Sequence, residues 1–326
     1  MTKTTLAPDS ARQRRFNVAL NVLAPANSKL GLAVSGGPDS LALLLLAAAA
    51  RPGKIEVATI DHGLRPESAK EAEMVAEICG KLGVPHTILK AEWKKKPETA
   101  IQERARIERY RLLGNWLKEK KLDALLTAHH LDDQAETMLM RLNRGSGARG
   151  LAGMRGVSPL PGSEARLLRP LLGWRRSELE EICKDAGLKP VEDPSNTDEK
   201  FERARVRKAL GSADWLDPEN IARSAAHLAQ ADVALHWATD REWESRVTRG
   251  DNEIVYRPEA PFEIRRRVVM RSLRELGREG RPGVIRGTEV DKLVNLLARG
   301  KKATLRGVLC SGGEEWRFTP APPRKA

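Results

Sequence analysis

The first 200 residues predict an α/β fold, in which helices cover both faces of a parallel sheet and a smaller, mainly helical domain follows. Short strand-like runs alternate in this part of the chain with longer helical segments. This alternation is typical of parallel sheets, because each helix carries the chain back to the starting edge. The alternation stops beyond residue 215, so we expect one domain over residues 1–215 and a second over residues 216–326.

The elements of the first domain are expected in a simple order. Apolar and β-branched runs predict strands over residues 30–34, 55–60, 86–89 and 124–128. A helix is predicted after each strand, over residues 41–50, 67–82, 99–118 and 131–143. The helix over residues 41–50 is apolar and has no β-branched residue, which favours a buried helix.

Helices predominate in the expected second domain. We predict them over residues 218–247, 261–276 and 288–297. One terminal strand is expected over residues 303–309, paired with residues 316–318, and the tail from residue 320 to residue 326 is expected to be disordered.

The charge and cysteine content restrict the class of protein. Lysine and arginine outnumber aspartate and glutamate by 57 to 44, a net charge of +13, which favours a polyanionic partner such as RNA or DNA, or a phosphate-rich ligand. We expect no membrane contact, because the chain has neither an apolar run of about 18 residues nor an apolar leader. The three scattered cysteines disfavour zinc ribbons and Cys-bound clusters and suit a reducing cytoplasm.

Two segments concentrate the positive charge. Residues 141–176 hold eight arginines and one acid, and residues 260–306 hold 13 basic residues and five acids. A solvated basic surface explains either segment alone. The presence of two such segments, one in each expected domain, favours a polyanion that spans both.

A phosphate-binding loop is predicted between the first strand and the first buried helix, at S-G-G-P-D-S. Its glycines let backbone N–H groups approach an anion, its serines can donate hydroxyl groups, and the helix start adds positive potential. Asp39 suits an Mg²⁺ ion that bridges carboxylate and phosphates. An ordinary glycine turn is the alternative. The residues predicted to bind the nucleotide are Ser35, Gly36, Gly37, Pro38, Asp39 and Ser40.

This loop resembles the PP-loop of ATP pyrophosphatases, which cleave ATP between the α and β phosphates to adenylate a substrate. Six further motifs lie in the order seen in bacterial tRNA(Ile)-lysidine synthetases: D-H-G-L-R-P-E-S from Asp61, R-x-x-R-Y from Arg106, H-H-L-D-D-Q-A-E-T from His129, R-G-S-G from Arg144, R-P-L-L from Arg169 and E-D-P-S-N from Glu192. The resemblance covers residues 28–210 nearly continuously. It implies a PP-loop nucleotide-binding domain, with a short form of the family's helical domain behind it.

Three residues of the H-H-L-D-D-Q-A-E-T motif are candidates for substrate binding. His129, Asp133 and Glu136 share a face if residues 131–143 form a helix. Such acids suit a metal or a cationic substrate, or they only complement the helix dipole. The resemblance implies that these acids bind the substrate, since the matching acids of the family lie where lysine and ATP meet. Asp133 and Glu136 are therefore candidate catalytic residues.

Arginines are the remaining candidates. The resemblance implies that Arg109 faces the ATP phosphates or the developing charge, although solvated arginines are usual in such a helix. It also makes the alternating arginines at 203, 205 and 207 candidates for contact with the tRNA backbone; a strand would align them on one face and a helix would spread them. Two consecutive arginines of the second domain are further tRNA candidates. These five residues are Arg203, Arg205, Arg207, Arg266 and Arg267.

The resemblance implies a complete reaction. ATP, free L-lysine and a tRNA(Ile) with anticodon CAU give lysidine at the first anticodon base, AMP and pyrophosphate, through an adenylated cytidine and with Mg²⁺ as cofactor. A PP-loop cytidine thiolase is one alternative, but it needs paired cysteines that this chain lacks. A non-catalytic basic RNA-binding protein is the other. The sequence leaves the oligomeric state open.

Overall fold

The computed structural model describes residues 6–63, 67–93, 101–191, 200–277 and 287–322. Parts of the D-H-G-L-R-P-E-S and E-D-P-S-N motifs and the last four residues lie outside the described residues. The chain divides into two compact units: Met1–Gly145 with Gly150–Ala226, and Ser146–Arg149 with His227–Ala326. The main division falls within α9 (Pro218–Arg246), downstream of the boundary that we expect near residue 215.

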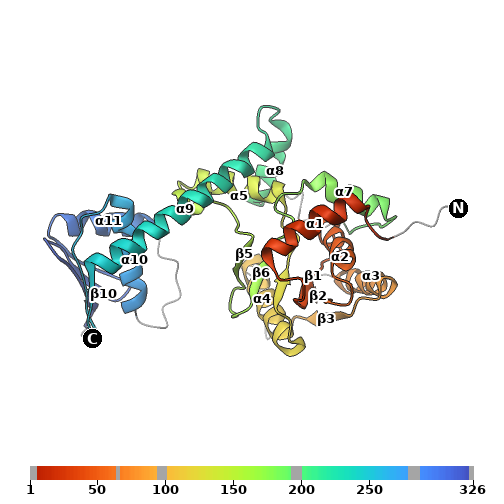
Figure 1. Cartoon of the computed structure of the whole chain (residues 1–326), viewed down its shortest axis with the longest axis horizontal. Helices are drawn as coiled ribbons and strands as arrows, with labels where there is room; N and C mark the ends of the chain where they lie inside the picture. The colour runs from red at the N-terminus through yellow and green to blue at the C-terminus, as the bar shows by residue number, and fades with distance from the viewer. Residues whose placement is uncertain (1–5, 64–66, 94–100, 192–199, 278–286, 323–326) are drawn as a thin grey trace. The chain divides into compact units, whose positions relative to one another are not determined.

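The first unit contains a six-stranded sheet in the order β3-β2-β1-β4-β6-β5 (Figure 1). The four predicted strands are present and parallel: β1 (Leu30–Ala33), β2 (Ile55–Asp61), β3 (His86–Lys90) and β4 (Ala124–Leu126). Two unpredicted strands of three residues extend the sheet, β5 (Val157–Pro159) and β6 (Arg166–Leu168). β6 is parallel to β4, and β5 is antiparallel to β6.

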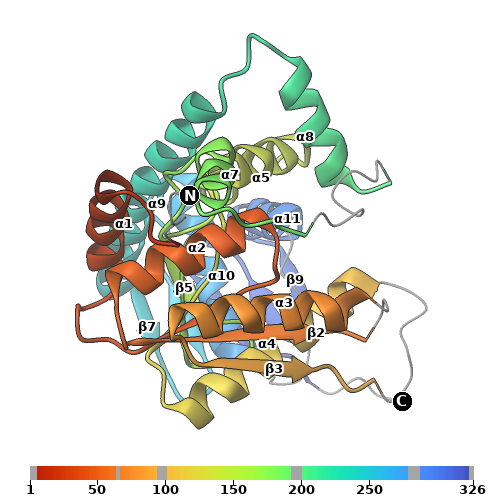
Figure 2. The same ribbon diagram turned by 90° about the vertical axis from the view of Figure 1, so that its right-hand side faces the viewer.

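Helices cover both faces of this sheet, as predicted. One core packs the strands against α1, α2, α3 and α7, and a second core packs the other face against α4. Figure 2 shows α2 and α3 on the same side of β2 and β3. The bounds of the helices are α1 (Ser10–Leu23), α2 (Pro38–Ala50), α3 (Glu67–Leu82), α4 (Ile101–Lys120), α5 (Leu131–Asn143), α6 (Ala148–Leu151), α7 (Arg176–Asp185) and α8 (Glu202–Ser212).

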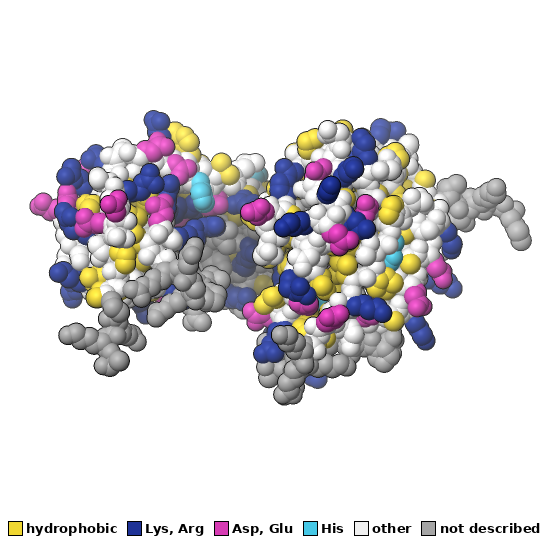
Figure 3. Space-filling model, turned by 90° about the horizontal axis from the view of Figure 1, so that it is seen from below, with side chains coloured by type: hydrophobic (Ala, Val, Ile, Leu, Met, Phe, Trp, Pro, Cys, Tyr) yellow, Lys and Arg dark blue, Asp and Glu magenta, His cyan; other side chains and the backbone are white. Residues whose placement is uncertain are grey.

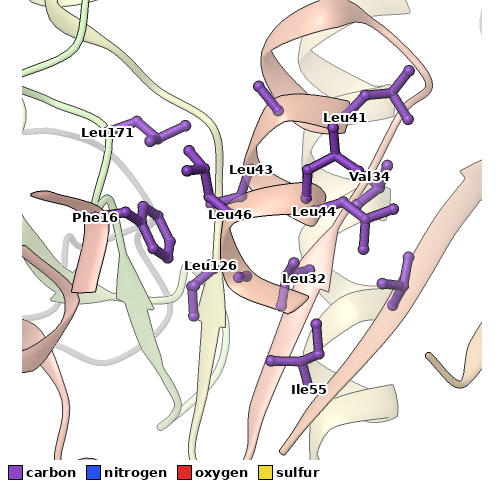
Figure 4. Packing of buried hydrophobic residues seen from close by; sticks show 14 of the residues in the cluster. Phe16, Leu32, Val34, Leu41, Leu43, Leu44, Leu46, Ile55, Leu126 and Leu171 are labelled. Atoms are coloured by element: carbon purple, nitrogen blue, oxygen red, sulfur yellow. The ribbon is translucent and has the colours of Figure 1, made fainter. Parts of the chain in front are cut away.

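The buried helix α2 fixes the position of the loop in front of it. Every residue of α2 from Ser40 to Ala47 is buried. Side chains such as Leu43 and Leu46 pack among Leu32, Leu126 and Phe16, which come from β1, β4 and α1 (Figure 4). A helix enclosed in this way cannot shift without opening cavities in the core. The α2 N-terminus is therefore held at the carboxyl end of β1.

The second unit combines the predicted helices with a larger sheet than the sequence indicates. α10 (Phe262–Leu276) and α11 (Gly287–Ala298) pack on an antiparallel sheet in the order β7-β8-β11-β10-β9. The strands are β7 (Val247–Arg249), β8 (Ile254–Tyr256), β9 (Lys302–Leu305), β10 (Val308–Ser311) and β11 (Trp316–Pro320).

The prediction of a single strand over residues 303–309 is wrong, because this segment is a hairpin of β9 and β10. Arg306 and Gly307 form its two-residue turn with φ values of +52° and +78°. Two positive φ values match the turn geometry that two-residue hairpins favour. The expected disorder does not begin at Pro320 either, since this residue pairs with Val308.

No helix within the described residues is long and apolar enough to cross a membrane.

Candidate active site at the carboxyl ends of β1 and β4

The predicted phosphate loop joins β1 to α2. Gly36 has a φ of +86°, and a Cβ atom there would lie 3.0 Å from the terminal methyl group of Met74, so the position requires glycine. The Ser35 amide donates to Ser40 Oγ (3.2 Å), which itself donates to the Gly37 carbonyl (2.9 Å). Ser40 is buried and closes the loop from within, whereas Ser35 is exposed.

The N-terminus of α2 has the electrostatic character that an anion requires. Gly37 occupies the N-cap position and offers no side-chain acceptor, and Pro38 follows at the first helical position. The N–H groups of the first turn therefore have no side-chain cap, and the helix dipole adds partial positive charge to them. A phosphate oxygen can accept from these groups.

A buried histidine connects the loop to α5. His130 is 1% exposed, and its Nε2 lies 3.6 Å from Asp39 Oδ2 and 3.6 Å from Asp133 Oδ2. Burial lowers the pKa of His130, but Asp132 and Asp39 raise it, with help from Asp133, to about 10. The imidazole is therefore a cation at neutral pH. The candidate residues from sequence omit His130, because Asp39 approaches it only in the folded chain.

The N-terminus of α7 holds a third carboxylate beside this histidine. Asp132 Oδ2 lies 3.5 Å from His130 Nδ1 and accepts from the Arg176 N–H (2.8 Å). Asp132 Oδ1 lies 3.3 Å from Nη2 of Arg175. Burial raises the pKa of Asp132, but His130, the Arg176 N–H and Arg175 outweigh burial and keep it below its usual value.

Two arginines of α8 form ion pairs with the two acids of α5 that are predicted to share a face. Glu136 is 2% exposed; its Oε2 accepts from Arg203 Nε (2.8 Å) and its Oε1 from Arg207 Nε (2.6 Å). Asp133 Oδ1 lies 3.5 Å from Arg203 Nη2, a longer contact. Asp133 and Glu136 therefore lie together, as their spacing predicts, but Glu136 already carries two cationic partners.

The alternating arginines lie on a helix, which settles the choice between helix and strand that the sequence leaves open. Arg203 and Arg207 are four residues apart and face Glu136, whereas Arg205 is exposed and donates to the Lys200 carbonyl (3.2 Å). The three side chains thus do not form one basic row.

His129 and Arg109 lie in a partly buried positive region. Burial lowers the pKa of His129 to about 4. The charge of Asp133 raises this pKa, whereas the charges of Arg169, Arg203 and Arg109 lower it further. His129 Nδ1 lies 2.9 Å from Thr127 Oγ1. Arg109 lies 5.4 Å from the centre of the Tyr110 ring, and burial lowers its pKa. His129 is therefore neutral, and Arg109 is desolvated.

Arg169 is a candidate that the sequence analysis missed. Its Nη1 donates to the Arg155 carbonyl (2.8 Å) and to Ser158 Oγ (3.0 Å), while its buried Nε has no hydrogen-bond partner among the described residues. The R-P-L-L motif that contains Arg169 was the available signal. Only the fold brings its charge close to His129.

The second unit places its two candidate arginines differently from the prediction. Arg267 is 8% exposed and donates to Asp232 Oδ1 (2.7 Å) and Glu263 Oε1 (2.8 Å). Arg266 is half-buried and donates to Asp291 Oδ1 (2.6 Å). Arg267 is therefore an internal structural residue in place of the expected phosphate contact, because its guanidinium is enclosed by acids. On the face shown in Figure 3, basic and acidic side chains are intermixed.

The carboxylates at the site do not form a metal cage of their own. No group of three or more His, Cys, Asp or Glu side chains in the described part of the chain could hold a metal ion. Asp39 is nevertheless suited to complete a metal site with ligand oxygens, because its buried Oδ1 has no hydrogen-bond partner among the described residues.

The fold and the loop define a PP-loop enzyme with an ATP-binding domain. Residues 8–213 match the PP-loop domain family. A solved structure, the U34-tRNA thiolase of Methanococcus maripaludis with its [4Fe-4S] cluster, superposes with a TM-score of 0.56 over 69% of this chain and 79% of that chain. Its sequence is 18% identical, so the likeness concerns the fold alone.

Relatives that align over nearly the whole chain identify the family within the PP-loop class. The chain is 45% identical to a tRNA(Ile)-lysidine synthase of Zymomonas mobilis over 96% of this chain and 95% of that protein. It is also 45% identical to a tRNA(Ile)-lysidine synthase of Novosphingobium aromaticivorans, over 97% of this chain and 96% of that protein. The chain belongs to the tRNA(Ile)-lysidine synthase family.

Proposed function

We propose that this enzyme joins the ε-amine of free L-lysine to C2 of the first anticodon cytidine of tRNA(Ile) with anticodon CAU. ATP is converted to AMP and pyrophosphate, and the intermediate is an adenylated cytidine. One observation carries the proposal: His130 contacts both Asp39 of the phosphate loop and Asp133 of α5. An anion-binding loop and a cation-binding carboxylate thus meet at one edge of the sheet, where ATP and lysine have to react.

The phosphate loop supports the first step of the reaction. The cytidine C2 oxygen attacks the α-phosphate, and pyrophosphate leaves toward the uncapped N-terminus of α2. Arg109 is partly buried, so its guanidinium stabilises the developing phosphate charge more strongly than a fully solvated one would. The target base has to leave the anticodon stack, as bases of single-stranded loops can.

Asp39 fits a magnesium site in the proposed complex. Mg²⁺ is usually held by one or two carboxylates together with phosphate oxygens and water. The unpartnered Oδ1 of Asp39 supplies one such ligand beside the phosphate loop. When bound, the ion would neutralise charge on the leaving pyrophosphate.

The second step requires a neutral lysine ε-amine, which attacks C2 while AMP departs. Asp133 is our candidate for the group that takes the proton from this amine. Both oxygens of Glu136 accept from arginines, whereas Asp133 accepts from the His130 N–H at Oδ2 and its Oδ1 has, among the described residues, a single 3.5 Å contact with Arg203. Asp133 is thus freer to bind an incoming ammonium group and to act as base.

The proposed tRNA contacts involve exposed arginines. Arg205 is exposed, and the side chain of Arg203 is 42% exposed at the edge of the acid pair. These residues, with the excess of positive charge, suit contacts with an RNA backbone. A substrate of this kind places the enzyme in the cytoplasm.

The test is incorporation of radiolabelled lysine into a tRNA(Ile) transcript with anticodon CAU in the presence of ATP and Mg²⁺. Matched controls are the same transcript with anticodon GAU, which offers no cytidine at the first position, and reactions without ATP. Incorporation confined to the CAU transcript supports the proposal. Tight binding of tRNA without incorporation would identify an RNA-binding protein instead.

A thiolase activity has little support in the described residues. Cys79, Cys183 and Cys310 are all buried, and burial raises the pKa of each thiol to about 12. Cys79 and Cys183 lie in one core and Cys310 in another. Such thiols are poor nucleophiles and poor cluster ligands.

A further inference from the structure

A chain of charged contacts leads from the first turn of α9 to the phosphate loop. Its inner end is His130, whose Nε2 faces Asp39 Oδ2 at 3.6 Å while its Nδ1 faces Asp132 Oδ2 at 3.5 Å. The ring is almost completely buried. A buried ring whose two nitrogens face carboxylates on opposite sides cannot rotate without losing both contacts.

The middle of this chain is Asp132, and both of its oxygens are engaged. The backbone N–H of Arg176 donates to Oδ2 (2.8 Å), and the guanidinium of Arg175 lies 3.3 Å from Oδ1. The carboxylate is thus fixed by the first residues of α7. Because Asp132 faces Nδ1 of His130, the fixed carboxylate orients the ring so that Nε2 faces Asp39 and Asp133.

The outer end of the chain is Arg175, whose side chain is 32% exposed. Its Nη1 lies 3.8 Å from Asp217 Oδ1 and 3.8 Å from Glu219 Oε1. These two acids flank the start of α9, and Asp217 accepts from the Glu219 N–H (2.8 Å). Arg175 therefore lies between the acids of α9 and the acid that supports His130.

We propose that Arg175 and Asp132 are positioning residues, which act through His130 to hold the Asp39 carboxylate in the orientation that binds ATP and its metal ion. The inference rests on the proposed role of Asp39. It adds two residues that the sequence does not single out as candidate site residues. It also makes the start of α9, the helix in which the two units divide, part of the support for the catalytic loop.

Arg175→Gln tests this series of contacts, and Arg176→Gln is a closely matched control. Arg176→Gln removes the neighbouring guanidinium, which pairs with Glu180 on the surface, but keeps the backbone N–H that binds Asp132. Loss of an indirect support of this kind typically weakens metal affinity or activity by about 10- to 100-fold. We expect Arg175→Gln to raise the half-saturating Mg²⁺ concentration and the ATP KM at least about 10-fold, and Arg176→Gln to change neither by more than about twofold.

A second variant and a binding measurement separate positioning from folding. Asp132→Asn keeps an acceptor for the Arg176 N–H but loses the charge, so it should reproduce the weaker Mg²⁺ and ATP binding. The melting temperature without ligand should stay close to that of the wild type, while the increase on addition of ATP and Mg²⁺ should shrink. Arg175→Lys should restore part of the affinity, because it retains a positive charge.

The outcomes distinguish the two proposals. If Asp39→Asn loses Mg²⁺-dependent ATP binding while Arg175→Gln and Asp132→Asn behave like Arg176→Gln, the positioning role is overturned and the role of Asp39 remains. If Asp39→Asn itself binds ATP and Mg²⁺ normally, the proposed function of the loop is wrong. Variants that bind ATP normally but melt early would show that the contacts only stabilise the fold.

Discussion

Among the described residues, a cluster of arginine, histidine and carboxylate lies in each unit, and the two clusters differ in how completely their polar atoms are paired. In the second unit, the three guanidinium nitrogens of Arg267 meet Glu263, His236 and Asp232. In the first unit, the buried Oδ1 of Asp39 has no hydrogen-bond partner among the described residues. The residue types are similar, yet within the described part of the chain only the first cluster contains a buried carboxylate oxygen that has no hydrogen-bond partner.

The degree of pairing distinguishes charged groups that stabilise the fold from charged groups that are available to a ligand. In a cluster such as that of Arg267, every guanidinium nitrogen already has a partner within the protein, so removal of the arginine should affect folding. A partly paired cluster beside an uncapped helix start has unused polar atoms, so its removal should affect binding and chemistry.

The largest expected effect concerns Arg267. Arg267→Gln leaves the buried Asp232 carboxylate without its arginine partner, and disruption of a buried pair typically costs about 3 to 5 kcal/mol in the free energy of unfolding. Arg266→Gln is the matched control, because Arg266 is more exposed, and should cost roughly 1 kcal/mol or less. Urea denaturation measures both. Equal stabilities of the two variants would contradict the structural role of Arg267.

The next largest effect concerns Asp39, which belongs to the partly paired cluster of the first unit. Asp39→Asn should lower lysine incorporation by about 10²- to 10³-fold, because charge stabilisation at the leaving pyrophosphate is lost. The melting temperature and the affinity for tRNA should stay close to wild type. Near-normal incorporation would show that this carboxylate is not part of the chemistry.

A smaller effect should separate Asp133 from Glu136. Asp133→Asn should slow lysine transfer about 10-fold or more while adenylation of the tRNA, followed with α-labelled ATP, is less affected, since a general base contributes to the second step alone. Glu136→Gln should impair both half-reactions, because it releases Arg203 and Arg207 from their shared partner. Identical profiles for the two variants would remove the division of roles.

The smallest effect is a dependence of stability on pH. Burial lowers the pKa of His129 to about 4, whereas an unfolded histidine titrates near 6.5. The unfolded chain therefore binds more protons between these values, and the free energy of unfolding should fall as the pH drops from about 6.5 to about 4. In His129→Gln, the fall in the free energy of unfolding between pH 6.5 and pH 4 should be smaller than in the wild type by on the order of 1 to 3 kcal/mol. A slope identical to that of the wild type would place His129 in a more solvated environment.

Local patterns in the sequence were sufficient for four of the six strands of the first sheet, for the buried helix and for the loop. The alternation of strands and helices predicted four parallel strands with helices on both faces, and the structure confirms them. The run of leucine and alanine after Pro38 predicted a buried helix, because every side of it is apolar. The glycines and Asp39 marked the loop, since backbone geometry and the start of a helix depend on neighbouring residues.

Only the tertiary structure decided which charges are paired. His130 became a site residue because folding brings Asp39 against it, and Glu136 is neutralised by arginines 67 and 71 residues further along the chain. Arg266 and Arg267 are adjacent in sequence, yet one lies partly exposed and the other lies buried among acids. Periodicity predicts the face of a helix, but the partner that this face meets depends on packing between distant segments.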